Sequence, residues 1–320
     1  MEVTMAENKI KLLAVVGPTA SGKTALSVRL AEKMDGEILS CDSMQIYRRM
    51  DIGTAKPTIE ERCGVVHHLF DIADPDEPYS CADYVRDAQK VIDVVVKNGK
   101  LPILCGGTGL YLDSLLRGGN FEETETDPVL REELRLYAEE KGNHALHERL
   151  RAVDPESADA IHENNVKRVI RALEIYMTSG MTKTEADARS RRFDSPYDAK
   201  VIGLRFEDRE LLYRRIDRRV DLMLSDGLLE ETKRLMEEGV FEKNSTAAQA
   251  IGYKELLGYL RGETTLAESV ESLKRATRRY AKRQMTWFGA KEYVEWITLD
   301  RDGKIKDANE ILKDALDIIQ

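Results

Sequence analysis

The most informative segment of the sequence is Lys11-Leu-Leu-Ala-Val-Val-Gly17-Pro18-Thr19-Ala20-Ser21-Gly22-Lys23-Thr24. It ends in the pattern Gly-x-x-x-x-Gly-Lys-(Ser/Thr), which binds phosphate when it follows a strand and opens a helix. The apolar run at residues 11–16 is typical of a buried parallel strand, and residues 24–34 carry apolar side chains at helical spacing. Glycines let backbone amides close around a phosphate, and the helix start points its positive end at that anion. The stretch therefore predicts an α/β domain with a phosphate-binding loop.

The segments that follow this loop continue the alternation of strand and helix. Residues 37–41 and 101–105 are further apolar strand candidates, and residues 84–96 between them have one apolar side at helical spacing. Strands that alternate with helices form a mainly parallel sheet. We therefore expect the fold class of the P-loop NTPases, α/β with a mainly parallel sheet flanked by helices.

The pattern changes after Arg117. Gly118, Gly119 and the acidic, Thr-rich residues 122–127 mark a boundary, and residues 128–180 show helical spacing only. Residues 200–204 then predict a return to the sheet, and residues 211–287 are helical again, with breaks at three glycines. The sequence thus predicts three parts: residues 1–117 as the first part of the P-loop core, 118–198 as an all-helical insertion, and 199–320 as the completion of the core with a C-terminal helical region.

Composition excludes several classes of protein. The chain has 320 residues and a net charge of −9, so a nucleic-acid site would have to be a local basic patch. No apolar run approaches the roughly 20 residues that span a bilayer, and the first residues lack a secretory pattern. The four cysteines are scattered without Cys-x-x-Cys spacing, and the five histidines show no metal-ligand spacing. We expect a cytoplasmic protein with reduced thiols and no membrane association.

The phosphate loop does not by itself name the reaction. Lys23 would reach the terminal phosphates, and the Thr24 hydroxyl would hold Mg²⁺. The default ligand is a nucleotide such as ATP. However, no apolar strand in the first part ends in Asp or Glu at the usual metal-holding position, and no Asn-Lys-x-Asp guanine signature is present. The loop is therefore also compatible with a diphosphate that is not part of a nucleotide.

Asp42 follows the second predicted strand. Ligands of open α/β sheets bind beyond the carboxyl ends of the strands, so this carboxylate is expected near the phosphate loop. An aspartate at this point is equally typical of a helix cap or a turn. The position alone leaves both interpretations open.

Further segments extend this pattern along the chain. They are Asp42-Ser-Met-Gln-Ile-Tyr47, Met50-Asp-Ile-Gly-Thr-Ala-Lys-Pro57, His67-His-Leu69, Gly106-Gly-Thr-Gly-Leu-Tyr111, Arg168-x-x-Arg-Ala-Leu-Glu174, Ile251-Gly-Tyr-Lys254 and Lys282-Arg-Gln-x-Thr-Trp287. In this order, and together with the phosphate loop, they resemble the tRNA dimethylallyltransferases (tRNA isopentenyltransferases) over residues 11 to 290. Some eukaryotic members of that family carry a C-terminal zinc finger, which this sequence lacks, so the bacterial type is the closer match.

The resemblance implies a reaction and its residues. Dimethylallyl diphosphate would bind at Gly17, Pro18, Thr19, Ala20, Ser21, Gly22, Lys23 and Thr24. The dimethylallyl group would move to the exocyclic N6 amine of the adenosine 3′-adjacent to the anticodon, giving N6-dimethylallyladenosine and diphosphate. Asp42 would be the general base and Thr108 would contact the reacting groups, while Lys23, Arg215 and Arg219 would hold the leaving diphosphate.

The resemblance also implies tRNA as the macromolecular partner. The expected contact residues are Asp42, Ser43, Met44, Gln45, Thr108, Arg131, Lys167, Arg168, Arg171, Gln249, Ile251, Gly252, Tyr253, Lys254, Lys282, Arg283, Gln284 and Trp287. The insertion would clasp the anticodon arm. Gly289-Ala290 departs from relatives that carry arginine there. No protein partner is implied, and we expect a monomer.

One segment is strongly basic. Residues 274–283 hold six basic residues and no acidic one, and helical spacing groups Arg275, Arg278, Arg279, Lys282 and Arg283 into one positive surface that could meet phosphates. The alternative is a solvated helix face paired with nearby acids. Tyr280 and Trp287 could stack on bases, although core packing is the favoured interpretation.

Three rival functions remain at this stage. A small-molecule kinase shares the phosphate loop and would turn over ATP without tRNA. An adenylate isopentenyltransferase would use a free nucleotide, which needs neither the helical insertion nor the basic C-terminal part. A non-enzymatic RNA-binding module would not need a phosphate loop beside Asp42.

Overall fold

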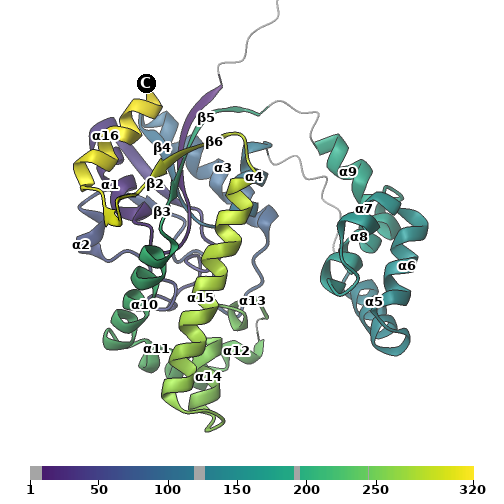
Figure 1. Cartoon of the computed structure of the whole chain (residues 1–320). Helices are drawn as coiled ribbons and strands as arrows, with labels where there is room; N and C mark the ends of the chain where they lie inside the picture. The colour runs from purple at the N-terminus through teal and green to yellow at the C-terminus, as the bar shows by residue number, and fades with distance from the viewer. Residues whose placement is uncertain (1–8, 119–126, 191–194, 244) are drawn as a thin grey trace, which may run out of the picture. The chain divides into compact units, whose positions relative to one another are not determined.

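The computed structural model describes residues 9–118, 127–190, 195–243 and 245–320. The chain forms two compact units (Figure 1). One combines the residues up to Leu116 with Pro196–Gln320, and the other comprises Arg117–Ser195. The second unit overlaps the expected insertion of residues 118–198. Most of the expected boundary segment, Gly119 and residues 122–126, lies outside the described residues.

The first unit contains a six-stranded sheet. Its strands are β1 (Ile10–Val16), β2 (Gly36–Ser40), β3 (His67–His68), β4 (Leu101–Gly106), β5 (Tyr197–Arg205) and β6 (Val294–Thr298). The order is β3-β2-β4-β1-β5-β6, and every neighbouring pair is parallel. The predicted fold class and the four predicted strands are confirmed. The two edge strands were not predicted, because one is only two residues long and the other lies beyond the last predicted helix.

Helices cover both faces of the sheet and extend below its carboxyl edge. Those of the first unit are α1 (Lys23–Met34), α2 (Ile59–Arg62), α3 (Cys81–Lys97), α4 (Gly109–Leu116), α10 (Arg209–Ser225), α11 (Leu228–Glu237), α12 (Val240–Lys243), α13 (Ser245–Ala248), α14 (Lys254–Leu260), α15 (Leu266–Gly289) and α16 (Ala308–Ile319). A short hairpin, β7 (Asp300–Arg301) and β8 (Lys304–Ile305), precedes α16. The predicted helical stretch from 211 to 287 therefore divides into several helices, and breaks occur at the expected glycines Gly227, Gly239 and Gly262.

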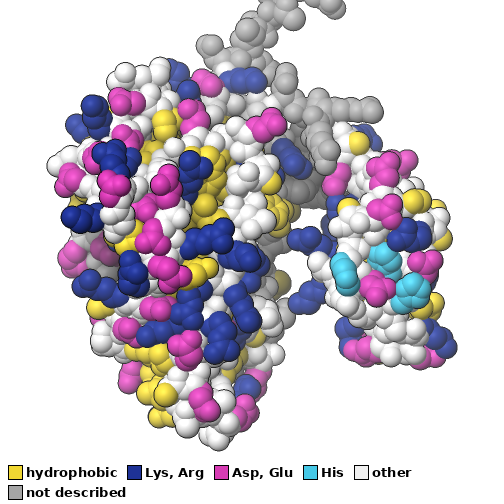
Figure 2. Space-filling model, in the orientation of Figure 1, with side chains coloured by type: hydrophobic (Ala, Val, Ile, Leu, Met, Phe, Trp, Pro, Cys, Tyr) yellow, Lys and Arg dark blue, Asp and Glu magenta, His cyan; other side chains and the backbone are white. Residues whose placement is uncertain are grey.

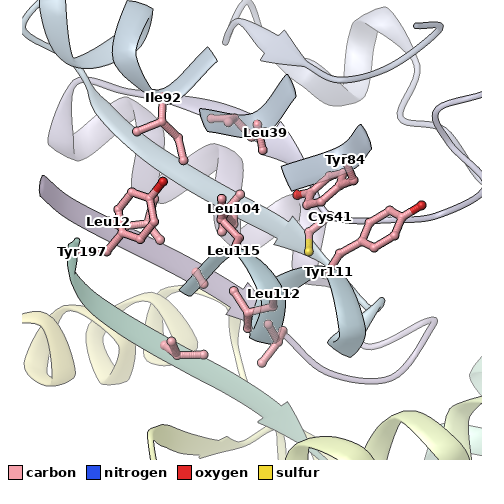
Figure 3. Close-up of a cluster of buried hydrophobic side chains, with 14 of the residues drawn as sticks. Leu12, Leu39, Cys41, Tyr84, Ile92, Leu104, Tyr111, Leu112, Leu115 and Tyr197 are labelled. Atoms are coloured by element: carbon pink, nitrogen blue, oxygen red, sulfur yellow. The ribbon is translucent and has the colours of Figure 1, made fainter. Parts of the chain in front are cut away.

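The sheet is buried on both faces. Side chains alternate along a strand, so Leu12 and Ala14 of β1 face α3 and α4, whereas Leu13 and Val15 face α1 and α16. Figure 3 shows the first of these cores, in which Tyr84 and Tyr111 stack with ring centroids 4.1 Å apart. This two-sided burial explains why the central strands are continuous apolar runs.

A third apolar cluster lies below the carboxyl edge of the sheet. It joins α10, α11, α14 and α15 to the segment after β2, and its fully buried residues include Ile46, Tyr47, Met50 and Tyr253. The long helix α15 runs past this cluster and back up to the sheet (Figure 1). The cluster therefore fixes the loops that follow β2 against the C-terminal helices.

The second unit is helical throughout its described residues. Its helices are α5 (Pro128–Lys141), α6 (Asn143–Val153), α7 (Pro155–Ala160), α8 (Val166–Ser179) and α9 (Lys183–Ser190). They have a core of their own, built around residues such as Leu146, Leu150 and Val169. Among the described residues of both units, no helix is long and apolar enough to cross a membrane.

Candidate active site

A cavity of about 340 Å³ opens at the carboxyl edge of the sheet. Thr19, Asp42 and Gly106, which belong to or follow β1, β2 and β4, line it together with side chains of α10 and α15. All of its lining residues belong to the first unit. The position is the one expected for ligand binding in an open α/β sheet, and the volume lies near the lower end of the range of roughly 300–1,000 Å³ for ligand pockets.

The phosphate loop joins β1 to α1 and is held from several directions. Gly17 has φ +139°, and a Cβ there would lie 2.6 Å from the Leu204 carbonyl oxygen, so no other residue fits. The Lys23 ammonium donates to the Pro18 carbonyl at 2.8 Å, and Arg215 Nε donates to the Ala20 carbonyl at 2.8 Å. These contacts together fix the shape of the loop.

Gln284 of α15 connects the phosphate loop to the loop after β4. Its Oε1 accepts from the Thr19 amide at 2.9 Å, and its Nε2 donates to the Gly107 carbonyl at 3.1 Å. The side chain is buried and lines the cavity. The resemblance assigns Gln284 to tRNA contact, and the structure adds a role in holding the phosphate loop.

The cationic groups of the cavity suit an anion. The pKa of Lys23 is lowered to about 8, mainly by burial and in smaller part by nearby Arg219, while Cys105 and Asp42 oppose the shift. Arg219 lines the cavity, and burial also lowers its pKa. A diphosphate would neutralise both groups. Arg215 lies outside the cavity lining, so its contact with the loop carbonyl makes it a support for the loop in this structure.

Asp42 lines the cavity and also closes a turn. Its Oδ1 accepts from the amides of Met44 at 2.9 Å and Gln45 at 3.4 Å. Burial raises the pKa of Asp42, and these hydrogen bonds and Lys23 oppose that shift. Since one oxygen fixes the turn and the carboxylate still reaches the cavity, both interpretations of this aspartate hold together.

Thr108 organises the segment beside Asp42. Its hydroxyl accepts from the Ser43 amide at 3.0 Å, and its own amide donates to the Cys41 carbonyl at 3.1 Å. The Thr108 side chain also forms a hydrogen bond with the Tyr280 side chain. Thr108 itself lies just outside the cavity lining, so its first observable role is to position Ser43 and Tyr280.

Most of the residues expected to contact tRNA near Asp42 gather at the cavity. Those that line it are Asp42, Ser43, Met44, Gln45, Gln249, Ile251, Gly252, Lys254, Arg283 and Gln284. The Gln45 amide donates to the Thr54 and Ala55 carbonyls, which ties the segment after β2 to the loop that follows it.

Tyr253, one of the residues expected to contact tRNA, has its side chain in the core. Its side chain is fully buried, its hydroxyl donates to Glu231 at 2.6 Å, and its ring covers Gly53, where an added Cβ would lie 2.5 Å away. The aromatic ring stabilises the third core and is not exposed for RNA contact. Trp287 also packs against the core, beside Gly109, as the favoured interpretation predicted.

Tyr280 differs from its favoured interpretation as a core residue. Core packing was the favoured interpretation, but the ring is only partly buried and lines the cavity. It is the one aromatic residue among the described residues that line the cavity. Helical spacing alone did not distinguish this tyrosine from a core residue. The sequence signal that points to the cavity is that Tyr280 lies one helical turn before Gln284, on the same face of α15.

The basic surface of α15 is narrower than its sequence suggests. Lys and Arg side chains gather over this helix in the view of Figure 2. However, Arg278 pairs with Asp217 of α10 at 2.6 Å and with Glu271, so it links two helices. Arg275, Arg279 and Arg283 instead surround a second hollow of about 290 Å³, and Lys282 is exposed. Arg278 therefore follows the alternative interpretation of a paired helix face.

The basic residues of the second unit also fall into two groups, those paired with an acid and those exposed to solvent. Arg131 and Arg171 both pair with Glu174, whose side chain is fully buried. Their contacts lie at 2.7 and 2.5 Å and lower the pKa of that carboxyl against its burial. Lys167 and Arg168 are exposed on α8. The first pair stabilises the helical unit, and the second pair is presented to solvent.

Some cavity residues were not predicted at all. Cys105 lies beside Lys23 and Thr24, and burial raises the pKa of its thiol. Val220 and Met223 of α10 also line the cavity. The sequence signal for the latter pair is their four-residue spacing from Ile216 and Arg219, which places them on the same side of the helix.

Comparisons with known proteins identify the family of this chain. The family model described as IPP transferase matches residues 45–291, and the model described as Isopentenyl transferase matches residues 10–69. The tRNA dimethylallyltransferase of Acetivibrio thermocellus is 51% identical over 289 residues, which cover 90% of this chain and 92% of that protein. The tRNA dimethylallyltransferase of Bacillus subtilis is 50% identical over 295 residues, which cover 92% and 93%.

Solved structures give the same result. The full-length tRNA isopentenylpyrophosphate transferase of Bacillus halodurans matches with a TM-score of 0.72 and 45% identity, over 97% of this chain and 96% of that one. A eukaryotic dimethylallyltransferase acting on tRNA matches with a TM-score of 0.74 and 30% identity, over 90% and 74%. The chain therefore belongs to the IPP transferase family, which includes the tRNA dimethylallyltransferases.

Proposed function

We propose that the protein transfers a dimethylallyl group from dimethylallyl diphosphate to the N6 amine of the adenosine 3′-adjacent to the anticodon in tRNA. The products are N6-dimethylallyladenosine and diphosphate. The observation that carries this proposal is that Asp42, Lys23 and Arg219 line one cavity beside a preformed phosphate loop. The names of the relatives, and the structural neighbour described as a dimethylallyltransferase acting on tRNA, support a dimethylallyl donor and a tRNA acceptor.

The charged end of the cavity would hold the donor diphosphate. Lys23, Arg219 and the loop amides would neutralise the charge that grows on the leaving group, and fixed electrostatics of this kind is usually the largest catalytic contribution. Arg215 would keep the loop in shape through the Ala20 carbonyl. This arrangement explains why a phosphate loop serves a prenyl transferase without phosphoryl transfer.

Mg²⁺ fits the same end of the cavity as a partner of the diphosphate. Among the described residues, no group of three His, Cys, Asp or Glu side chains could hold a metal ion, so a cage made by the protein alone is absent there. Mg²⁺ commonly uses one or two protein oxygens together with phosphate oxygens and water. The Thr24 hydroxyl, which lines the cavity, would hold the ion, and the ion would supply further charge neutralisation at the diphosphate.

Asp42 would act on the adenine amine. The bond between the allylic carbon and the diphosphate oxygen breaks with its electron pair going to diphosphate, and the amine nitrogen forms the new bond to that carbon. Asp42 then takes the amine proton. The nitrogen lone pair is delocalised into the adenine ring, so such general-base help is worth about 10²–10⁴-fold in rate. Alignment of amine and carbon in one cavity adds a proximity contribution.

The tRNA would meet the first unit over the exposed arginines of α15, and the target base would leave its stack to enter the cavity. Lys167 and Arg168 are the exposed basic residues through which the helical unit would clasp the anticodon arm. We propose that the protein acts as a monomer in the cytoplasm, where it would meet its tRNA substrate.

The direct test supplies radiolabelled dimethylallyl diphosphate and Mg²⁺ with unmodified tRNA, AMP or ATP as parallel acceptors. We expect label in tRNA, with a rate about 10²–10⁴-fold lower for Asp42→Ala. Asp76→Ala, which changes an exposed aspartate outside the cavity, is the matched control and should leave the rate unchanged. Label in AMP alone would indicate an adenylate isopentenyltransferase. Turnover of ATP without label in any acceptor would indicate a small-molecule kinase.

A further inference from the structure

The cavity has a charged end and an apolar end. Lys23, Thr24 and Arg219 line the first. Six apolar lining residues belong to the third core cluster or pack against it, namely Met44, Val220, Met223, Ala250, Ile251 and Leu273, whereas Ile216, beside Arg219, belongs to the second cluster. A ligand that suits this cavity therefore carries an anionic group and a short hydrocarbon part.

Helix α10 sets the order of these two ends. Arg215 contacts the phosphate loop, and Arg219, one turn later, lines the cavity. Met223, a further turn along, lines it as well. Each four-residue step advances about 6 Å along one helix face. The helix thus leads from the phosphate loop along the cavity, with arginines first and apolar side chains next.

Several apolar side chains of the lining are held in place by the core. Val220 and Leu273 are each only 2% exposed, because they are part of the core between α10 and α15. Met223 is half-buried and packs against the same cluster from α10. A methionine fills irregular space through three rotatable bonds, so Met223 can adapt to the space that the buried Val220 and Leu273 leave.

We propose that Val220, Met223 and Leu273 seat the hydrocarbon chain of the donor, and that Met223 limits that chain to five carbons. This inference rests on the proposed function and adds the residues that select the donor. A ten-carbon allylic diphosphate, with its diphosphate at the phosphate loop, needs the space that Met223 occupies. The transfer step is otherwise the same: the carbon–oxygen bond breaks toward diphosphate, the nitrogen–carbon bond forms, and Asp42 takes the amine proton.

Pocket size gives the expected magnitude. One methylene in an apolar pocket changes the specificity of an enzyme by about 10–200-fold. Met223→Ala removes several heavy atoms from the end of the cavity, so the ratio of kcat/KM for geranyl diphosphate to that for dimethylallyl diphosphate should rise at least about 10-fold. Met223→Phe fills the same space and should raise the KM for dimethylallyl diphosphate about 10-fold or more while leaving tRNA binding unchanged.

The test measures kcat/KM for both diphosphates with unmodified tRNA in the parent protein and the two variants. Leu222→Ala is the matched control, because Leu222 is the neighbouring residue on α10, is 52% exposed and lies outside the cavity lining. Thermal unfolding checks that each variant is folded. If one of the two Met223 variants is unfolded, the donor ratio of the other Met223 variant tests the proposal. A changed ratio in the Met223 variants with an unchanged ratio in Leu222→Ala supports the proposal.

Two failures are distinguishable. A parent protein that transfers dimethylallyl to tRNA, with the same donor ratio in the parent and in folded Met223 variants, overturns the role of Met223 alone. A parent protein that transfers neither group to tRNA overturns the proposed function, and the role of Met223 falls with it.

Discussion

Glu231 of α11 holds the loop that forms one wall of the cavity. Its carboxylate accepts from the amides of Asp51, Ile52 and Gly53, each at 3.1 Å, and from the Tyr253 hydroxyl at 2.6 Å. The side chain is 8% exposed, so water replaces few of these contacts when they are lost. Gly53 lines the cavity, together with the two residues that follow it. Glu231→Gln replaces one carboxylate oxygen by an amide group, and it tests whether this convergence of donors stabilises the protein and the cavity.

The expected cost follows from these contacts. A hydrogen bond to a charged group contributes about 1.5–3 kcal/mol to stability. A glutamine keeps one acceptor oxygen, and its amide group cannot accept from backbone donors. If the oxygen takes the Oε1 position, the two hydrogen bonds that Oε2 accepts, from the amides of Asp51 and Ile52, are lost, so at least two of the five hydrogen bonds disappear. We expect the free energy of unfolding to fall by about 3 kcal/mol, a large part of the total of about 5–15 kcal/mol that domains have. The KM for the donor or for tRNA should rise, since the cavity wall loses its support.

Urea unfolding followed by tryptophan fluorescence is the appropriate assay. Both tryptophans, Trp287 and Trp296, lie in the first unit, so the signal reports the unit that contains Glu231. Glu230→Gln is the control, because Glu230 is the exposed neighbour in the first turn of α11 and should change stability by no more than about 1 kcal/mol. A change of less than about 0.5 kcal/mol for Glu231→Gln, the range of ordinary surface substitutions, would refute the reasoning.

The other predictions concern the charged end of the cavity. Transfer needs protonated Lys23 to hold the donor and ionised Asp42 to take the amine proton. The value of kcat/KM for the donor should therefore fall above about pH 8, the lowered pKa of Lys23, and should fall in acid at a pH above the ordinary range of an aspartate. A pH–rate profile checks both limbs, and an alkaline limb at the ordinary lysine value of 10.5 would contradict the first. Gln284→Leu should lower the free energy of unfolding by about 1–3 kcal/mol and raise the KM for the donor, because it leaves the Thr19 amide and the Gly107 carbonyl without their partner. Urea unfolding and donor kinetics measure both effects, and an unchanged KM would show that the loop keeps its shape without this bridge.

The sequence alone determined the features that depend on neighbouring residues. The phosphate loop was readable because Gly17 and Gly22 supply positive φ angles at fixed spacing, and because the strand and helix that flank them are contiguous with the motif. The central strands were readable because burial on both faces gives continuous apolar runs. The place of Asp42 followed from a general property of parallel sheets, whose strands end at one edge.

Only the tertiary structure decided which distant residues meet. Gln284 contacts a loop 265 positions earlier in the chain, and Glu231 collects amides about 180 positions away, and neither pairing leaves a local pattern. Helical periodicity defines a face but not what covers that face, so it could not tell that Tyr253 is buried in a core while Tyr280 lines a cavity. The edge strand β6 likewise became a strand through pairing with β5, since a short strand is stabilised by its neighbour more than by its own residues.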